Sequence, residues 1–107
     1  MAQDYVMLKE SSRNGTIAIN KIVFHSIALI SLQEVQNVVP AEGYMAKPVT
    51  VKIDKNHLNV EANIKVKYGE NAAVASGQVQ NRIYENILFM TGYKPASVTV
   101  NVQNFEF

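Results

Sequence analysis

The two histidines, His25 and His57, are the side chains best suited to acid–base or metal chemistry in this sequence. A zinc site or a general base needs further ligands or an orienting carboxylate at short spacing, and no such carboxylate group accompanies either histidine. Ser26 follows His25 directly, but a nucleophile elbow and an obvious orienting acid are missing. We therefore expect surface or boundary histidines, no metal site and no enzymatic activity.

Phosphate-binding and thiol chemistry are not indicated either. The five glycines form neither a GxGxxG motif nor a P-loop, so we expect no cofactor. The chain has no cysteine, which rules out disulfides and thiolate metal sites and suits a reducing compartment. Gly77 falls inside an expected helix, where glycine costs about 1 kcal/mol relative to alanine. We expect it to permit close packing against a neighbouring element.

Length and charge limit the organisation of the chain. A chain of 107 residues supplies one hydrophobic core, so we expect a single domain over residues 1–107. Net charge is +1 with both signs interleaved, which gives no electrostatic case for polyanionic partners. Residues 1–4 lack the features of a signal peptide, and no apolar stretch approaches the roughly 20 residues that span a bilayer. We expect a cytoplasmic protein without direct membrane insertion.

The clearest structural signal is a hairpin around Lys55 and Asn56. Apolar residues alternate with polar residues over 49–54 and again over 58–68. A two-residue turn then sets Ile53 against Leu58, Val51 against Val60 and Val49 against Ala62, and a slip of one residue would destroy this match. Because the second strand outruns the first, residues 64–68 need another partner, which places this strand inside the sheet.

Two helices and further strands complete the pattern. Asn20 and Asn71 are good N-caps for helices that run to about Val35 and Thr91. We expect strands at 16–19 and 98–102, a bulge near residue 104, a loop over 36–48, and an edge strand and turn within residues 1–14. The second helix carries one apolar stripe, formed by Ala72, Ala75, Val79, Ile83, Ile87 and Met90.

This order predicts an α+β fold. The elements follow the order β-α-β-β-α-β and form a two-layer sandwich with a mainly antiparallel sheet. Each strand has one apolar face, so both helices should cover the same face of the sheet and leave the other face open.

The first helix has more apolar surface than one packing face uses. Phe24, Ile27, Ala28, Ser31 and Val35 form the expected core arc. Ile22 and Leu29 project from the opposite side, and Val23 and Ile30 extend that surface. Exposed aliphatic side chains are common, so this feature has an ordinary structural explanation as well as a functional one. The candidate interaction surface consists of Ile22, His25, Leu29, Gln33, Tyr84, Leu88 and Phe89.

Nucleic-acid binding through the open sheet face is the alternative function. It is suggested by the topology and by Lys52, Lys65 and Lys67 on that face. Related folds bind RNA through aromatic side chains displayed there, and the outward positions carry none. Those positions are Thr50, Lys52, Asn59, Glu61, Asn63, Lys65, Lys67, Thr99, Asn101 and Gln103.

From Gly15 to about Val102, the sequence resembles the alkaline shock protein family, stress-response proteins of the cell envelope found mainly in Gram-positive bacteria. The resemblance rests on residues 15–19, which run into the first helix, on the segment from Val66 to Asn71, and on the closing strand 98–102. Between them, Val74-Ala75, Val79-Gln80 and Thr91-Gly92 follow the family's order and approximate spacing. Because the charged tails of some larger members are missing, the chain is similar to the compact members.

The resemblance implies a non-enzymatic protein linked to envelope homeostasis or the general stress response. It also implies protein partners, among them a membrane-anchored protein that would keep this chain close to the membrane, and self-association into a homo-oligomer. The family supplies no catalytic residues.

Overall fold

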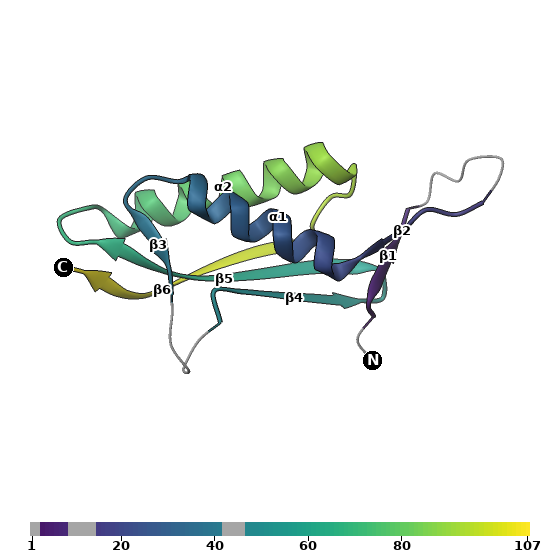
Figure 1. Ribbon diagram of the computed structural model, residues 1–107, viewed down its shortest axis with the longest axis horizontal. Helices are drawn as coiled ribbons and strands as arrows, with labels where there is room; N and C mark the ends of the chain where they lie inside the picture. The colour runs from purple at the N-terminus through teal and green to yellow at the C-terminus, as the bar shows by residue number, and fades with distance from the viewer. Residues whose placement is uncertain (1–2, 9–14, 42–46) are drawn as a thin grey trace.

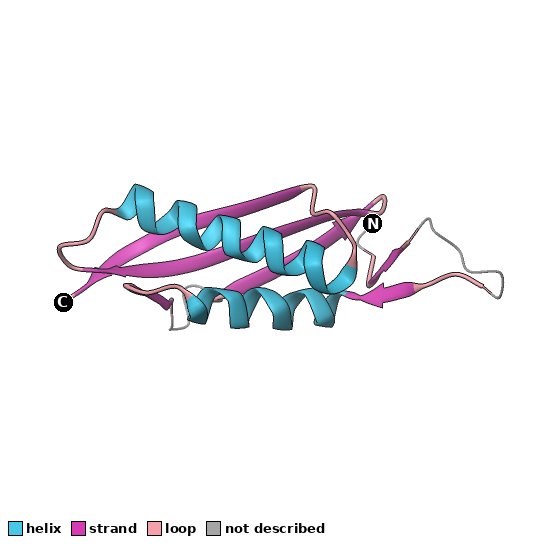
Figure 2. Cartoon of the chain, turned by 90° about the horizontal axis from the view of Figure 1, so that it is seen from above, coloured by secondary structure: helices cyan, strands magenta, loops and turns pink. Residues whose placement is uncertain are grey.

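The computed structural model describes residues 3–8, 15–41 and 47–107, which form a layer of two helices over a twisted sheet (Figures 1 and 2). Both helices lie on the same face of the sheet, as the alternation of apolar residues predicts. The fold is α+β, and the predicted element order is confirmed. The elements are β1 (Tyr5–Met7), β2 (Ala18–Asn20), α1 (Lys21–Glu34), β3 (Val38–Pro40), β4 (Val49–Asp54), β5 (His57–Lys67), α2 (Ala72–Thr91) and β6 (Ser97–Glu106).

The long strand β5 is the centre of the main sheet. Strand β6 pairs with one edge of β5 in parallel, and β4 and β3 pair antiparallel with successive parts of the other edge. Residues 64–66 of β5 therefore have a partner on each side, as predicted from the greater length of this strand. Alternate residues of β5, from Leu58 to Val66, are fully buried beneath the helices.

The hairpin has the predicted register. Ile53 pairs with Leu58, Val51 with Val60 and Val49 with Ala62. Lys55 and Asn56 both have positive φ, at 50° and 61°, as a two-residue turn with right-handed twist requires. The predicted bulge in β6 is also present, because Val102 pairs with Ile64 while Asn104 pairs with the next residue, Lys65.

Both helices begin at the predicted N-caps and end within one residue of the predicted positions. Asn20 accepts the N–H of Ile22 and Asn71 accepts the N–H of Val74. Gly92 ends α2 in the left-handed conformation, with φ 74°. The predicted core arc of α1 is buried, and α1 packs over β4 and β3 while α2 packs over β6.

Four expectations differ from the structure. The first predicted strand, β2, pairs with β1 in a separate two-stranded sheet. The expected loop 36–48 contains β3, which forms because Val38 and the residues after it can pair with the free edge of β5. Met90 is 60% exposed rather than part of the core stripe. A Cβ at Gly77 would meet no atom within 4 Å, so this glycine is not required by close packing.

Gly77 provides a test of these packing assignments. We expect Gly77→Ala to raise the free energy of unfolding by roughly 0.5–1 kcal/mol, because alanine restricts the unfolded chain and fits the open space beside α2. Urea unfolding monitored by circular dichroism measures the change. Gly92→Ala is the matched control and should destabilise, since its φ is positive. A loss of stability in Gly77→Ala would contradict the open environment.

Candidate functional site

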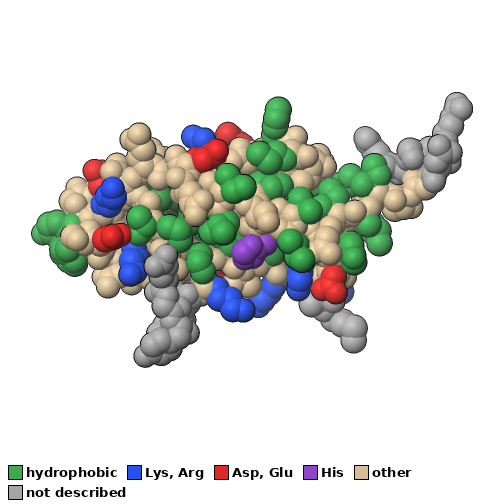
Figure 3. Space-filling view, viewed as in Figure 1, with side chains coloured by type: hydrophobic (Ala, Val, Ile, Leu, Met, Phe, Trp, Pro, Cys, Tyr) green, Lys and Arg blue, Asp and Glu red, His purple; other side chains and the backbone are tan. Residues whose placement is uncertain are grey.

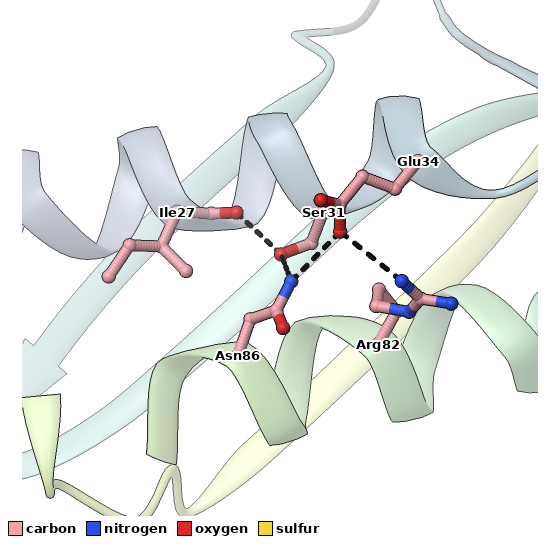
Figure 4. A network of polar contacts seen from close by, with 5 residues as sticks. All are labelled: Ile27, Ser31, Glu34, Arg82 and Asn86. Atoms are coloured by element: carbon pink, nitrogen blue, oxygen red, sulfur yellow. Dashed lines mark hydrogen bonds and ion pairs between the residues drawn. The ribbon is translucent and has the colours of Figure 1, made fainter. Parts of the chain in front are cut away.

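A polar network fixes how the two helices lie against each other (Figure 4). Asn86 of α2 donates from Nδ2 to Ser31 Oγ at 2.8 Å and to Glu34 Oε1 at 3.1 Å. Buried Ser31 in turn donates to the Ile27 carbonyl at 2.6 Å, and Arg82 Nη1 lies 3.4 Å from Glu34 Oε1. These contacts set the antiparallel register of α1 and α2 and identify the side on which each helix faces the other.

The predicted surface residues of α1 share one flank. At 100° per residue, Ile22, His25, Leu29 and Gln33 lie on the side of α1 away from Ser31 and from α2. Ile22 is 66% exposed, while Leu29 is half-buried and packs against the core. The structure therefore brings these four predicted residues together, and their role in binding stays a prediction.

The predicted residues of α2 do not join them. Tyr84 lines a shallow hollow with Gln80, Ala96 and Val98, on the β6 side of the helix layer. Leu88 follows Tyr84 by one turn and lies on the same side, away from Asn86 and α1. The seven predicted residues therefore occupy opposite flanks of the helix layer, with Phe89 between the flanks, and do not form one continuous surface.

Phe89 instead lies on the same outer side of the helix layer as Val23 and Ile30, which the sequence indicated only as extensions of the predicted surface. It lies two turns from Arg82 on the same side of α2, while Val23 and Ile30 lie on the same side of α1 as Glu34. Because Arg82 pairs with Glu34, these apolar side chains share the outer surface of the helix pair. We call Val23, Ile30 and Phe89 the helix-layer patch.

The helix-layer patch is open to solvent. Phe89 is 89% exposed, and Val23 and Ile30 are exposed as well. Figure 3 shows hydrophobic side chains gathered over the helices on the face it displays. The apolar spacing of α1 pointed to Val23 and Ile30, but their relation to Phe89 depends on the helix register, which the sequence does not reveal.

A cavity of about 570 Å³ lies where β1 meets the β4–β5 turn and the end of α2. Two of its polar side chains have structural partners. Asn56 accepts the N–H of Met7 at 2.8 Å and donates to its carbonyl at 3.0 Å, and Tyr93 donates its hydroxyl to the Asn56 carbonyl. This geometry holds the β1–β2 hairpin against the main sheet and does not indicate catalysis.

The structure also locates the two histidines. His25 and His57 are both exposed and lie on α1 and at the start of β5. Within residues 3–8, 15–41 and 47–107, no three histidine, aspartate or glutamate side chains form a group that could hold a metal ion.

The open sheet face is polar, and its centre is bonded internally. Buried Asn63 donates to the Lys47 carbonyl at 2.7 Å and accepts hydrogen bonds from Asn101 Nδ2 at 3.1 Å and Gln103 Nε2 at 2.9 Å. At the other end, Ser97 Oγ donates to Asn59 Oδ1 at 2.7 Å. Nucleic-acid binding here stays a prediction, which titration with single-stranded RNA at low salt would test.

Family comparison agrees with the sequence resemblance. The model of the alkaline shock protein 23 family, described as having a cell envelope-related function, matches residues 9–107. The chain belongs to this family. Comparison with curated proteins and with solved structures gave no match.

Membership assigns the protein a cell envelope-related function. In the described part of the chain, no helix is both long enough and apolar enough to cross a membrane.

The helix network gives a matched pair of predictions. We expect Asn86→Ala to lower the free energy of unfolding by about 1 kcal/mol, since it removes the amide that joins Ser31 to Glu34. Arg82→Ala should cost less than about 0.5 kcal/mol, because its ion pair with Glu34 is largely exposed. Urea unfolding of both variants measures the difference. An equal loss of unfolding free energy in the two variants would argue against the Asn86 amide as the main polar contact between the helices.

The raised pKa of Tyr93 predicts a loss of stability at alkaline pH. Burial raises the pKa of the Tyr93 phenol above its usual 10.0, so the folded protein holds this proton more tightly than the unfolded chain does. The resulting stability is complete below pH 10.0 and is lost as pH rises through the raised pKa. We expect Tyr93→Phe to show a shallower fall in melting temperature with rising pH. Parallel curves would contradict this contribution from Tyr93.

Proposed function

We propose that this protein is a non-enzymatic interaction or scaffolding protein that supports cell-envelope homeostasis or the general stress response. The observation that carries the proposal is the helix-layer patch, in which Phe89 is 89% exposed beside two exposed aliphatic side chains. A large aromatic side chain gains little by facing water, whereas burial against a partner removes its apolar surface from solvent. Clustered apolar side chains on the surface of a soluble fold are typical of protein-binding sites.

The surroundings of the patch favour a protein partner over a small molecule. The patch stands on the outer side of the helix pair, where Arg82 and Glu34 supply a polar border. An apolar centre with a charged rim is the usual anatomy of a protein interface. The flank that carries Ile22 and Leu29 adjoins this surface and would extend the contact.

The partner that we propose is a membrane-anchored protein. Such a partner would hold a cytoplasmic protein close to the membrane, which would fit the family's cell envelope-related function. The described helices could not provide this attachment by spanning the bilayer themselves.

A comparison of surface variants tests this function. Crosslinking in the native cell, followed by affinity recovery, should capture a membrane-anchored partner with the wild-type protein and at least about tenfold less of it with Phe89→Asp, a change of ~1.4 kcal/mol. The matched control is Val74→Asp, because Val74 is also exposed on α2 but lies at the other end of the helix. It should leave recovery unchanged.

Both substitutions fall on exposed side chains, so thermal unfolding should show little loss of stability in either. Equal recovery with Phe89→Asp and the wild type would overturn the proposed surface. Equal loss with Val74→Asp would show that charge on α2, and not the patch, determines the interaction.

A further inference from the structure

Strand β6 forms an open edge of the main sheet. It extends over Ser97–Glu106 and, in the described part of the chain, pairs with β5 alone. All of its residues from Val102 onward are exposed. Figure 1 shows the C-terminal end of β6 continuing beyond the start of α2, so the helix layer does not cover this end of the strand.

The hydrogen-bonding pattern identifies which groups are free. In a parallel ladder, alternate residues direct both backbone groups toward the neighbouring strand. The contact of Glu106 with Tyr68 and the bulge at residue 103 place the backbone groups of Val98, Val100, Val102 and Phe105 on the outer edge.

At each end of this set, a side chain of the same chain bonds one of the two outward backbone groups. Gln80 donates to the Val98 carbonyl at 2.8 Å, and the Phe105 N–H donates to Asn104 Oδ1 at 2.8 Å. Between them, Val100 and Val102 direct an N–H and a carbonyl each toward solvent.

The opposite edge of the sheet, formed by β4 and β3, is better protected against pairing with another strand than β6 is. The Gln3 N–H bonds to the outward carbonyl of Ile53 at 2.7 Å, and exposed Lys52 lies next to it on β4. Strand β3 has three residues and ends in Pro40. Lysine, proline and short length are common devices against edge pairing, whereas residues 97–105 of β6 contain no charge and no proline.

The free groups of β6 are self-complementary. If two copies of β6 run antiparallel about a two-fold axis at Asn101, Val100 of one copy faces Val102 of the other, and each pair exchanges two backbone hydrogen bonds. Thr99 then faces Gln103, and Asn101 faces its own copy. Valine meets valine on the helix side and polar residues meet on the open side, so no like charges are opposed.

We propose that β6 pairs with β6 of a second copy about this axis, joining the two sheets into one. The partner strand that we propose is β6 of a second copy, because the backbone groups and side chains of β6 match those of an antiparallel copy of itself. The pairing uses the sheet edge and leaves the helix-layer patch free. It therefore goes beyond the proposed function, and either proposal can fail without the other.

Charged substitutions at Asn101, on the two-fold axis, test the proposal. Sedimentation velocity over a wide concentration range should show a reversible dimer of the wild-type protein. Asn101→Lys and Asn101→Glu should each raise the dimer Kd at least about tenfold, or ~1.4 kcal/mol, because like charges face each other across the axis. An equimolar mixture of the two variants should restore association. Thr50→Lys is the matched control, since it adds the same charge to the open face of β4, and it should leave Kd unchanged.

Amide exchange provides an independent readout if substitution at Asn101 disturbs its bond to Asn63. The N–H groups of Val100 and Val102 should exchange more slowly as wild-type concentration rises. Val102→Pro removes an outward N–H without a loss from the β5 ladder, and it should abolish the dimer.

A wild-type monomer at every concentration would overturn the proposal, as would exchange of these two amides that does not depend on concentration. A dimer that is unchanged by Asn101→Lys and Val102→Pro but lost in Phe89→Asp would overturn it in favour of pairing through the helix layer.

Discussion

The structure depends on a single strand that is paired along both edges and covered on one face. β5 supplies the partner for β3, β4 and β6, and its alternate residues from Leu58 to Val66 form the floor on which the helices pack. Burial of these aliphatic side chains stabilises the fold by roughly 25 cal/mol for each Å² of apolar surface removed from water. Turning the strand so that its other face met the helices would lose this stabilisation. A slip of one residue would turn every one of them to solvent, so the register of β5 also fixes the register of its partners.

The same arrangement explains where apolar surface is left over. Two helices suffice to cover the apolar face of a narrow sheet, and each uses one side for this purpose. The outer surface of α1 and α2 is thus free, and the polar network of Ser31, Glu34 and Asn86 brings Val23, Ile30 and Phe89 together there. At the sheet, β6 leaves the helix layer before it ends and exposes backbone groups at its outer edge. The fold therefore leaves two separate surfaces uncovered, one apolar and one composed of backbone donors and acceptors.

Local chemistry made much of the fold predictable. The caps at Asn20 and Asn71, the end of α2 at Thr91, the turn at Lys55 and the phase shift after Val102 each depend on residues close in sequence, and all five appear as predicted. The candidate surface was predictable in part, because helical periodicity groups Ile22 with Leu29 without any knowledge of packing. Met90 shows the limit of this reasoning. It continues the apolar stripe of α2, yet it is exposed, because its environment depends on how far the neighbouring elements extend.

By itself, the sequence determined the α+β class, the hairpin register and the extent of both helices, since alternation, capping and turn preferences act over a few residues. It also carried the family pattern that the comparison confirmed. Tertiary structure alone decided that β1 and β2 form their own sheet, that β3 pairs with the end of β5, and that Phe89 shares a surface with residues of α1. These outcomes depend on contacts between residues that are distant in the chain. Several pairings of such residues satisfy the same local pattern, and packing against the single central strand selects among them.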